Sequence, residues 1–329
     1  MRKLDRTFSV APMMDWTDRH CRYLHRLFSE HTLLYTEMVT APAVIHGNQD
    51  RLLEFDVAEH PLALQLGGSD PVQLEVATRL GCEYGYDEIN LNVGCPSDRV
   101  QSGQFGACLM QQPELVADCV QAMCEGSSGA EVTVKCRIGV DDQVPSDILP
   151  IFLETVSSRG IKSFIIHARM AWLDGLSPKE NRDIPPLDYD LVHRMKADFL
   201  PLDIVINGGI DSLHDAKDHL ARGLDGVMIG RSAYHRPADI LASVDKFLFG
   251  ADVGKTADDV VPQMLPYIEQ QLSQGKRLNQ ITRHMLGLFA GRPGARQWRQ
   301  TLSERAHTDG AGPEVVEAAL ACVRPMEVV

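Results

Sequence analysis

The sequence predicts an α/β protein in which an eight-stranded (β/α)8 barrel is followed by a small all-helical C-terminal domain. Eight short apolar runs each end in polar or glycine residues, and each is followed by a stretch with helical spacing. After Gly230 this alternation stops, and the rest of the chain has amphipathic stretches without a convincing strand. The 329 residues exceed the roughly 250 that a barrel needs, which leaves room for the second domain.

The expected strands lie at 8–13, 33–38, 62–67, 88–93, 132–138, 163–168, 203–207 and 226–230. Helices of βαβ units are expected between them, at 71–80, 113–123, 148–159, 187–197 and 212–222. This alternation favours a closed TIM barrel. The alternative, an open doubly wound sheet, would need a dinucleotide-type glycine loop after the first strand, where this chain has Ala11-Pro12-Met13-Met14.

We expect the barrel to span residues 1–250 and the helical domain residues 251–329. The boundary is expected near Phe249-Gly250-Ala251, and the segment 291–294, Gly-Arg-Pro-Gly, should interrupt the helices that follow. This domain has several amphipathic stretches, including 257–272, 278–289 and 313–322.

Composition predicts a globular cytoplasmic protein. Hydrophobic residues make up 44% of the chain and charged residues 23%, which is sufficient for a large core. No apolar run is long enough to cross a membrane, and the N-terminal segment lacks an apolar signal core. The eight cysteines show neither a CxxC pair nor zinc-ligand spacing, so we expect free thiols and no metal. Nothing in the sequence implies a protein partner.

The charge distribution is uneven. A net charge of −13 argues against a protein that coats nucleic acid with its whole surface. Between Lys276 and Arg305, however, seven basic residues face the single acid Glu304. Arg296 and Arg299, three residues apart, would share one helix face. Taken alone, this segment fits a solvated helix face as well as a binding surface.

The last two predicted strands end in a pattern typical of phosphate binding. In a (β/α)8 barrel the functional residues lie at the carboxyl ends of the strands. Here the seventh strand ends in Asn207-Gly208-Gly209 and the eighth in Gly230-Arg231. The glycines allow backbone N–H groups to approach an anion, and the arginine adds charge. The pattern predicts a ligand that carries phosphate.

Three other strand ends carry polar residues where aliphatic ones are usual, namely Gln65, Lys135 and His167. Together they could line a planar heterocycle, with Lys135 placing positive charge near a ring that becomes anionic on reduction. Flavin mononucleotide (FMN) satisfies both this requirement and the phosphate requirement.

Cys95 lies in a loop shaped by Gly94 and Pro96, just past the fourth strand. A thiol there is mostly protonated at neutral pH unless cations lower its pKa, so it can serve as an acid. It could also be a nucleophile, which would need a base such as His167 beside it. The sequence leaves both roles open.

Several motifs resemble those of the tRNA-dihydrouridine synthases of subfamily A. They are APMMDWTDR at 11–19, NVGCPS at 92–97, TVKCRIG at 133–139, HAR at 167–169, SPKENR at 177–182, NGGI at 207–210 and MIGR at 228–231. The resemblance covers nearly the whole chain, including the helical C-terminus.

The resemblance implies that the chain reduces uridine to dihydrouridine at positions 20 and 20a of the tRNA D-loop, with FMN as cofactor and NADPH as reductant. Cys95 would then give a proton to C5 while the flavin gives a hydride to C6. The residues implied to hold FMN are Pro12, Met13, Met14, Gln65, Lys135, His167, Asn207, Gly208, Gly209, Gly230 and Arg231. Those implied to hold the substrate are Asn92 and Arg169 at the uracil, and Lys179, Arg182, Arg296 and Arg299 at the RNA backbone.

Two other functions fit part of the sequence. A flavin barrel reductase acting on a small molecule would keep the cofactor but leave the basic helical segment unexplained. A non-catalytic RNA-binding protein on a barrel scaffold would leave Cys95 and the flavin residues unexplained.

Overall fold

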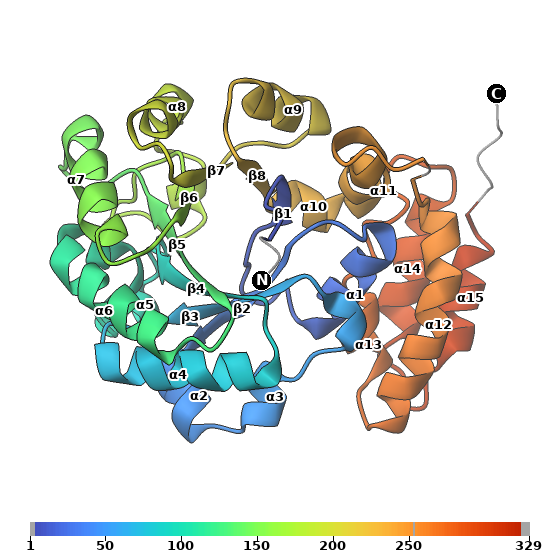
Figure 1. The fold of residues 1–329 in the computed structure, drawn as a ribbon. Coiled ribbons are helices and arrows are strands. Elements are labelled where there is room, and N and C mark those ends of the chain that lie inside the picture. The colour runs from blue at the N-terminus through green and yellow to red at the C-terminus, as the bar shows by residue number, and fades with distance from the viewer. Residues whose placement is uncertain (1–3, 253, 324–329) are drawn as a thin grey trace.

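The computed structural model describes residues 4–252 and 254–323, in which eight parallel strands form a ring surrounded by helices (Figure 1). The strands are β1 (Phe8–Val10), β2 (Leu34–Thr40), β3 (Leu62–Gly67), β4 (Glu88–Val93), β5 (Glu131–Arg137), β6 (Ser163–His167), β7 (Asp203–Asn207) and β8 (Gly226–Ile229). All eight predicted strands are therefore confirmed. The parts of the predicted domains at residues 1–3, 253 and 324–329 lie outside the described residues.

The sheet closes on itself. Its order is β1-β8-β7-β6-β5-β4-β3-β2, and a parallel bridge between Ser9 and Leu33 joins β1 to the residue before β2. There the Val10 N–H donates to the Leu33 carbonyl at 3.0 Å, and the Leu33 N–H donates to the Phe8 carbonyl at 3.1 Å. The predicted barrel is confirmed, and the open doubly wound sheet is excluded.

Long helices follow most strands and cover the outside of the ring (Figure 1). They are α1 (Arg19–Phe28), α4 (Pro71–Tyr84), α6 (Pro113–Gly126), α7 (Pro145–Ser157), α8 (Tyr189–Asp198), α9 (Leu213–Ala221) and α11 (Pro237–Leu248). Local sequence explains their bounds, as α4 illustrates. It begins where the Asp70 side chain accepts the N–H groups of Val72 and Gln73, and it ends at Gly85, whose φ of 92° favours glycine.

Shorter elements occupy the loops between strands and helices. They are α2 (Ala41–His46), α3 (Gln49–Leu53), α5 (Asp98–Ser102), α10 (Arg231–His235), and the 3-10 helices η1 (Val57–Glu59), η2 (Gly106–Gln111) and η3 (Glu180–Arg182).

The C-terminal region is helical, as predicted, with α12 (Ala257–Ser273), α13 (Leu278–Thr282), α14 (Ala295–Arg305) and α15 (Pro313–Leu320). The helix predicted at 278–289 is wrong beyond Thr282, where turns replace it. A Cβ at Gly287 would lie 2.1 Å from the His235 carbonyl oxygen, so this segment runs tight against the loop after β8. Among the helices of the described residues, none is long and apolar enough to span a membrane.

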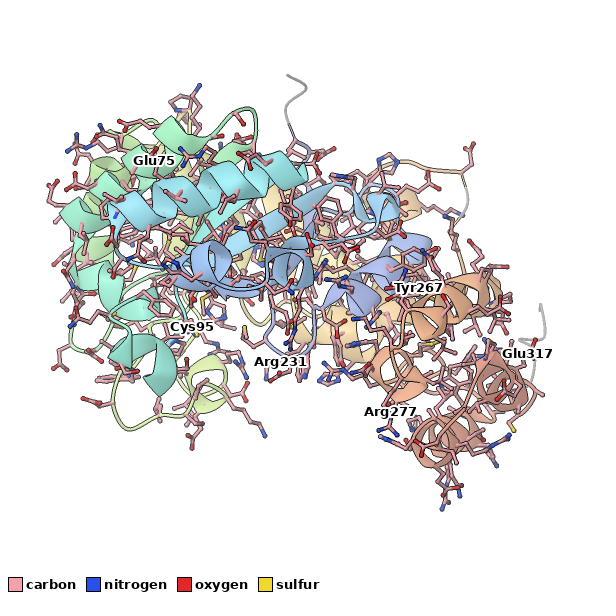
Figure 2. The ribbon with its side chains drawn as sticks, turned by 90° about the horizontal axis from the view of Figure 1, so that it is seen from below. Glu75, Cys95, Arg231, Tyr267, Arg277 and Glu317 are labelled. Carbon is pink, nitrogen blue, oxygen red and sulfur yellow. The ribbon has the colours of Figure 1, made fainter. Side chains whose placement is uncertain are left out.

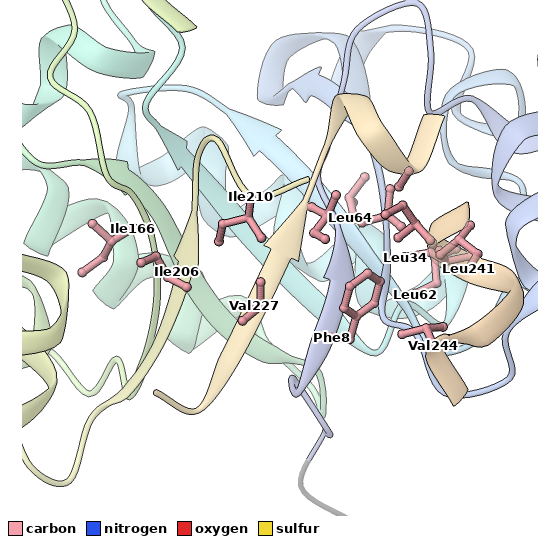
Figure 3. Close-up of a cluster of buried hydrophobic side chains, with 14 of the residues drawn as sticks. Phe8, Leu34, Leu62, Leu64, Ile166, Ile206, Ile210, Val227, Leu241 and Val244 are labelled. Atoms are coloured by element: carbon pink, nitrogen blue, oxygen red, sulfur yellow. The ribbon is translucent and has the colours of Figure 1, made fainter. Parts of the chain in front are cut away.

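The main hydrophobic core lies between the barrel and its outer helices. Phe8, Leu34 and Leu62 are buried and lie beside Leu241 and Val244 of α11 (Figure 3). A smaller apolar cluster fills part of the barrel interior and consists of Ala11, Leu33, Tyr35, Ala63, Ile165, Val205 and Met228. Much of the remaining interior, on β3 to β5, is buried and polar.

The C-terminal helices dock on α1 and on the loop before it. Tyr267 of α12 stacks on Tyr23 with ring centroids 3.9 Å apart, and its hydroxyl lies 2.8 Å from Nδ1 of His20. His284 follows α13 and places Nε2 3.0 Å from a carboxylate oxygen of Asp18. Burial opposes the charge on Asp18, but the hydrogen bond with His284 lowers its pKa to about 2. This hydrogen-bonded contact fixes the helical region beside the carboxyl ends of the strands.

Candidate active site

A cleft of about 1750 Å³ opens where the carboxyl ends of the strands meet. Residues from every strand or from the loop that follows it line the cleft, and Lys276, Gln280 and Arg283 complete it from the helical region. Figure 2 shows Cys95 and Arg231 towards the same face of the barrel, beyond which the helices near Arg277 project. Pockets for one small ligand typically hold about 300–1,000 Å³, so this cleft has room for more than one ligand.

The cleft is basic although the chain is acidic. Ten arginine and lysine residues line it: Arg19, Arg22, Arg51, Lys135, Arg137, Arg182, Arg231, Arg236, Lys276 and Arg283. Five aspartate and glutamate residues line it: Asp15, Asp18, Glu37, Glu54 and Asp211. The excess of five positive charges contrasts with a net charge of −13 for the chain. Such a cleft attracts anionic ligands.

The glycines predicted to bind phosphate form a narrow turn after β7. Gly208 and Gly209 have φ angles of 110° and 71°, which side chains rarely tolerate. A Cβ at Gly208 would come within 3.1 Å of Nε2 of His167, and one at Gly209 within 2.5 Å of the Leu187 side chain. Arg231 lies nearby with its guanidinium 2.8 Å from Asp183, and this hydrogen bond lowers the pKa of Asp183. The glycines therefore let this turn pack closely against His167 and Leu187 while it lines the cleft.

Lys135 and His167 form the polar floor beside this turn. The Lys135 Nζ donates to Oδ1 of Asn207 at 3.0 Å. Burial, helped by the charge of Arg137, lowers the pKa of Lys135 to about 8. Burial also holds the pKa of His167 well below its usual range, so this imidazole is neutral. Nδ1 of His167 is buried without a hydrogen-bond partner, as expected for an atom that serves a ligand.

Cys95 is held in a defined loop and is half-buried. Its backbone N–H donates to Oδ1 of Asn92 at 2.9 Å, and its Sγ lies 3.5 Å from the Ser97 hydroxyl. Arg137 also fixes the loop, because its Nε donates to the Gly94 carbonyl at 3.1 Å. No hydrogen bond joins Cys95 to His167, both of which are described. The nucleophile interpretation therefore lacks the base that it requires, and the arrangement favours an acid.

The structure brings most of the predicted site residues together. The cleft is lined by Pro12, Met13, Met14, Gln65, Asn92, Cys95, Lys135, His167, Arg182, Asn207, Gly208, Gly209, Gly230 and Arg231. Four predicted substrate residues are not in its lining. Arg169 turns away and donates to the Pro185 carbonyl. Lys179, Arg296 and Arg299 are exposed outside the cleft.

Sequence reasoning did not assign Arg137, Lys276 or Arg283 to the site. Arg137 follows Lys135 by two residues, and this spacing on a strand places both side chains on the same face, which was an available signal. Lys276 and Arg283 belong to the basic segment seen in the sequence, but they reach the cleft only because the region around α13 docks against Asp18, which that segment alone does not reveal.

Comparisons with known proteins decide the family. A family model described as dihydrouridine synthase (Dus) matches residues 9–323. The chain belongs to the dihydrouridine synthase family. Relatives named tRNA-dihydrouridine(20/20a) synthase include one from Shewanella oneidensis, 59% identical over 98% of this chain and 96% of its own. Another, from Escherichia coli K12, is 61% identical over 96% of this chain and 91% of its own.

The solved structures that resemble this dihydrouridine synthase family member share its fold. Morphinone reductase aligns with a TM-score of 0.52 at 13% identity, over 76% of this chain and 87% of its own. An old yellow enzyme homologue from Zymomonas mobilis aligns with a TM-score of 0.54 at 12% identity, over 76% of this chain and 90% of its own. At such low identity the likeness supports the barrel and says nothing about substrate.

Proposed function

We propose that the chain is a tRNA-dihydrouridine(20/20a) synthase that acts in the cytoplasm and reduces the C5–C6 bond of uridine at positions 20 and 20a of the D-loop. The observation that carries the proposal is the basic cleft, with Cys95 in its lining, in a chain whose net charge is −13. The printed names of the relatives support the same substrate.

The residues of the cleft fit FMN, and enzymes of this family are flavin-dependent. Gly208, Gly209 and Arg231 line the cleft together, which is an arrangement that suits a phosphate. The unpartnered Nδ1 of His167 and the ammonium group of Lys135 are available to a polar ring. When bound, FMN would supply the hydride for C6 of uracil, with NADPH as its reductant.

The chain itself supplies a proton donor and electrostatic orientation. Cys95 would give a proton to C5 of uracil, because its thiol lines the cleft and has no base paired with it. Asn92 would orient the ring from the same loop, and Arg182 would contact the RNA backbone at the cleft mouth. Arg169 could contribute only by leaving the Pro185 carbonyl. Reaching a base in folded RNA requires extruding it from its stack.

The cleft favours RNA over the small-molecule alternative. Its volume of about 1750 Å³ exceeds that of a pocket for one small ligand, and Lys276 adds a positive charge that a neutral free pyrimidine would not need. A non-catalytic RNA-binding role leaves the unpartnered Nδ1 of His167 unexplained.

The function is tested with purified protein and tRNA from a strain that lacks dihydrouridine at positions 20 and 20a. We expect the protein to be yellow, to release FMN on denaturation, and to form dihydrouridine at both positions when NADPH is added. Free uridine, as the matched control, should remain unreduced. Reduction of free uridine at a rate comparable with tRNA would favour the small-molecule reductase, and a colourless protein that resists flavin loading would favour the scaffold role.

A second expectation concerns Arg296 and Arg299, which are exposed on α14 around the buried Trp298. If both bind RNA phosphates, neutralising them to glutamine should weaken tRNA binding without affecting flavin reduction. The slope of log affinity against log salt should become shallower by roughly one unit for each phosphate that is no longer bound. Affinity is measured across a salt series for the parent and the double variant.

The matched control neutralises Arg79 and Arg159, which are exposed at outer barrel helices and pair with Glu75 and Asp118. Their neutralisation should leave both affinity and slope unchanged. If the plots of log affinity against log salt superimpose for the parent and for the Arg296 and Arg299 double variant, these two residues do not contact the RNA.

A further inference from the structure

A chain of buried polar side chains runs through one side of the barrel interior. Its members lie on β3, β4 and β5, at positions where (β/α)8 barrels normally carry branched aliphatic residues. On β4, Glu88, Asn90 and Asn92 point inward together, because alternate residues of a strand share a face. Glu88 and Asn90 are fully buried and Asn92 is 9% exposed, so most of their polar atoms need partners within the protein.

Successive hydrogen bonds connect these side chains. The Thr133 hydroxyl donates to Oε1 of Glu88 at 2.5 Å. Nδ2 of Asn90 donates to Oγ1 of Thr133 at 2.8 Å. Nε2 of Gln65 donates to Oδ1 of Asn90 at 2.8 Å. Nδ2 of Asn92 donates to Oε1 of Gln65 at 2.8 Å. This series of hydrogen bonds thus reaches from the base of the barrel to its mouth.

Both ends of the chain require the same direction of donation. At the base, Glu88 forms an ion pair with Arg6 at 2.6 Å, and its carboxylate can only accept. At the mouth, Oδ1 of Asn92 accepts the backbone N–H groups of Gly94 at 3.1 Å and of Cys95 at 2.9 Å, which can only donate. Every side-chain amide between the ends therefore directs its nitrogen towards Glu88 and its oxygen towards the Cys95 loop.

This direction limits what Asn92 can offer a ligand. Both acceptor positions of its Oδ1 are filled by backbone N–H groups, and one of its two amide hydrogens is bonded to Gln65. One N–H remains, and it can meet only an acceptor. A uracil carbonyl oxygen is such an acceptor, whereas the exocyclic amino group of cytosine is a donor.

We propose that Glu88 and Thr133 are positioning residues for the site. They terminate a one-way chain of hydrogen bonds that holds the Cys95 loop in place and restricts Asn92 to donating one N–H to a pyrimidine carbonyl oxygen. The part that concerns the pyrimidine rests on the proposed function, while the part that concerns the loop does not.

The test removes the link at Thr133 and keeps Glu88, because neutralising Glu88 would deprive the buried Arg6 of its partner. Thr133→Val keeps the shape and loses the hydroxyl, so Nδ2 of Asn90 loses its buried acceptor. Thr133→Ser keeps the hydroxyl. Tyr35→Phe is the matched control, since the Tyr35 hydroxyl also donates to Oε1 of Glu88, at 2.6 Å, but does not continue the chain.

The first readout is the rate at which iodoacetamide alkylates Cys95, mapped by mass spectrometry and normalised to the exposed Cys322. Loosening of the loop should raise this rate at least about threefold in Thr133→Val. Thr133→Ser and Tyr35→Phe should match the parent. Should Thr133→Val fail to fold, Thr133→Ala removes the same hydroxyl with less bulk and replaces it.

The second readout separates the two half-reactions in rapid mixing. In Thr133→Val the uridine-reducing half-reaction should slow about tenfold, because a misplaced loop spoils the geometry of proton transfer. NADPH-driven reduction of the flavin should stay within about twofold, which a general loss of structure would not produce.

Three results would overturn the proposal: parent-like behaviour of Thr133→Val in both readouts, equal impairment of Thr133→Ser, or equal slowing of both half-reactions. If the parent reduces no uridine in tRNA, the proposed function fails, and the alkylation comparison still decides the positioning of the loop.

Discussion

Replacement of Cys95 by alanine is expected to lower the rate of dihydrouridine formation by about 10²–10⁴-fold, the contribution of a positioned general acid. The thiol lines the cleft, and its Sγ lies 3.5 Å from the Ser97 hydroxyl. Its removal takes away the proton for C5 but none of the groups expected at the flavin. Binding of FMN and tRNA, and reduction of the flavin by NADPH, should therefore stay near the parent values.

The measurement follows the two half-reactions separately in the parent and in Cys95→Ala. Cys108→Ala is the matched control, because that half-buried thiol contacts the Phe105 carbonyl and is not in the cleft lining. Dihydrouridine formation by Cys95→Ala at the parent rate would refute the general-acid role. A covalent adduct between Cys95 and tRNA that is required for turnover would instead restore the nucleophile interpretation.

The second large effect concerns stability. Lys135→Met should stabilise the cofactor-free protein at pH 7 although it weakens FMN binding. Burial lowers the pKa of Lys135 from 10.5 to about 8, so the folded state bears a cost when the ammonium is charged. At about 1.4 kcal/mol per pKa unit this cost is about 3.5 kcal/mol. The missing hydrogen bond to Asn207 offsets about 1 kcal/mol, which leaves a gain of about 2.5 kcal/mol.

The sign of the pH dependence follows from the lowered pKa. Below pH 8 Lys135 is charged in both the folded and unfolded states, so the parent bears the full burial cost. As the pH rises from about 8 to 10.5, the folded state loses its proton first and the cost fades. The stability gain of Lys135→Met over the parent should therefore be largest below pH 8, and above pH 10.5 only the effect of the missing hydrogen bond to Asn207 should remain.

Urea unfolding of the cofactor-free proteins between pH 7 and 10.5 measures this difference. Lys162→Met provides the control, because Lys162 is exposed outside the cleft and its replacement should change stability little at any pH. A variant at Lys135 that is no more stable than the parent at pH 7, or a difference that does not depend on pH, would contradict the argument. The expected combination of higher stability and weaker FMN binding is typical of a residue kept for function.

The sequence by itself determined the barrel, and most of the candidate site residues that it predicted line one cleft. The eight strands were predictable because buried parallel strands produce short apolar runs that end in polar or glycine residues, as at Asn207-Gly208-Gly209. Residues from distant strands, such as Gln65 and Lys135, could then be assigned to one site without any contact information. The reason is geometric, since the carboxyl ends of all strands in a parallel barrel meet at one face.

Only the tertiary structure decided which strand-end side chains point inward and what partners they have. Arg169 lies at a strand end like Arg137, yet Arg169 turns to the Pro185 carbonyl while Arg137 enters the cleft. The helix predicted over 278–289 ends at Thr282, and turns follow it. In these turns Gly287 lies so close to the His235 carbonyl that a side chain would not fit.

The direction of the buried hydrogen-bond chain likewise depends on groups far apart in sequence. Glu88 and the backbone N–H of Cys95 impose it from opposite ends of the barrel, and the strand pattern alone does not reveal which atom of each amide faces which neighbour. Sequence periodicity reports which face a residue occupies. The pairing of donors with acceptors depends on distances between strands, and these exist only once the barrel has closed.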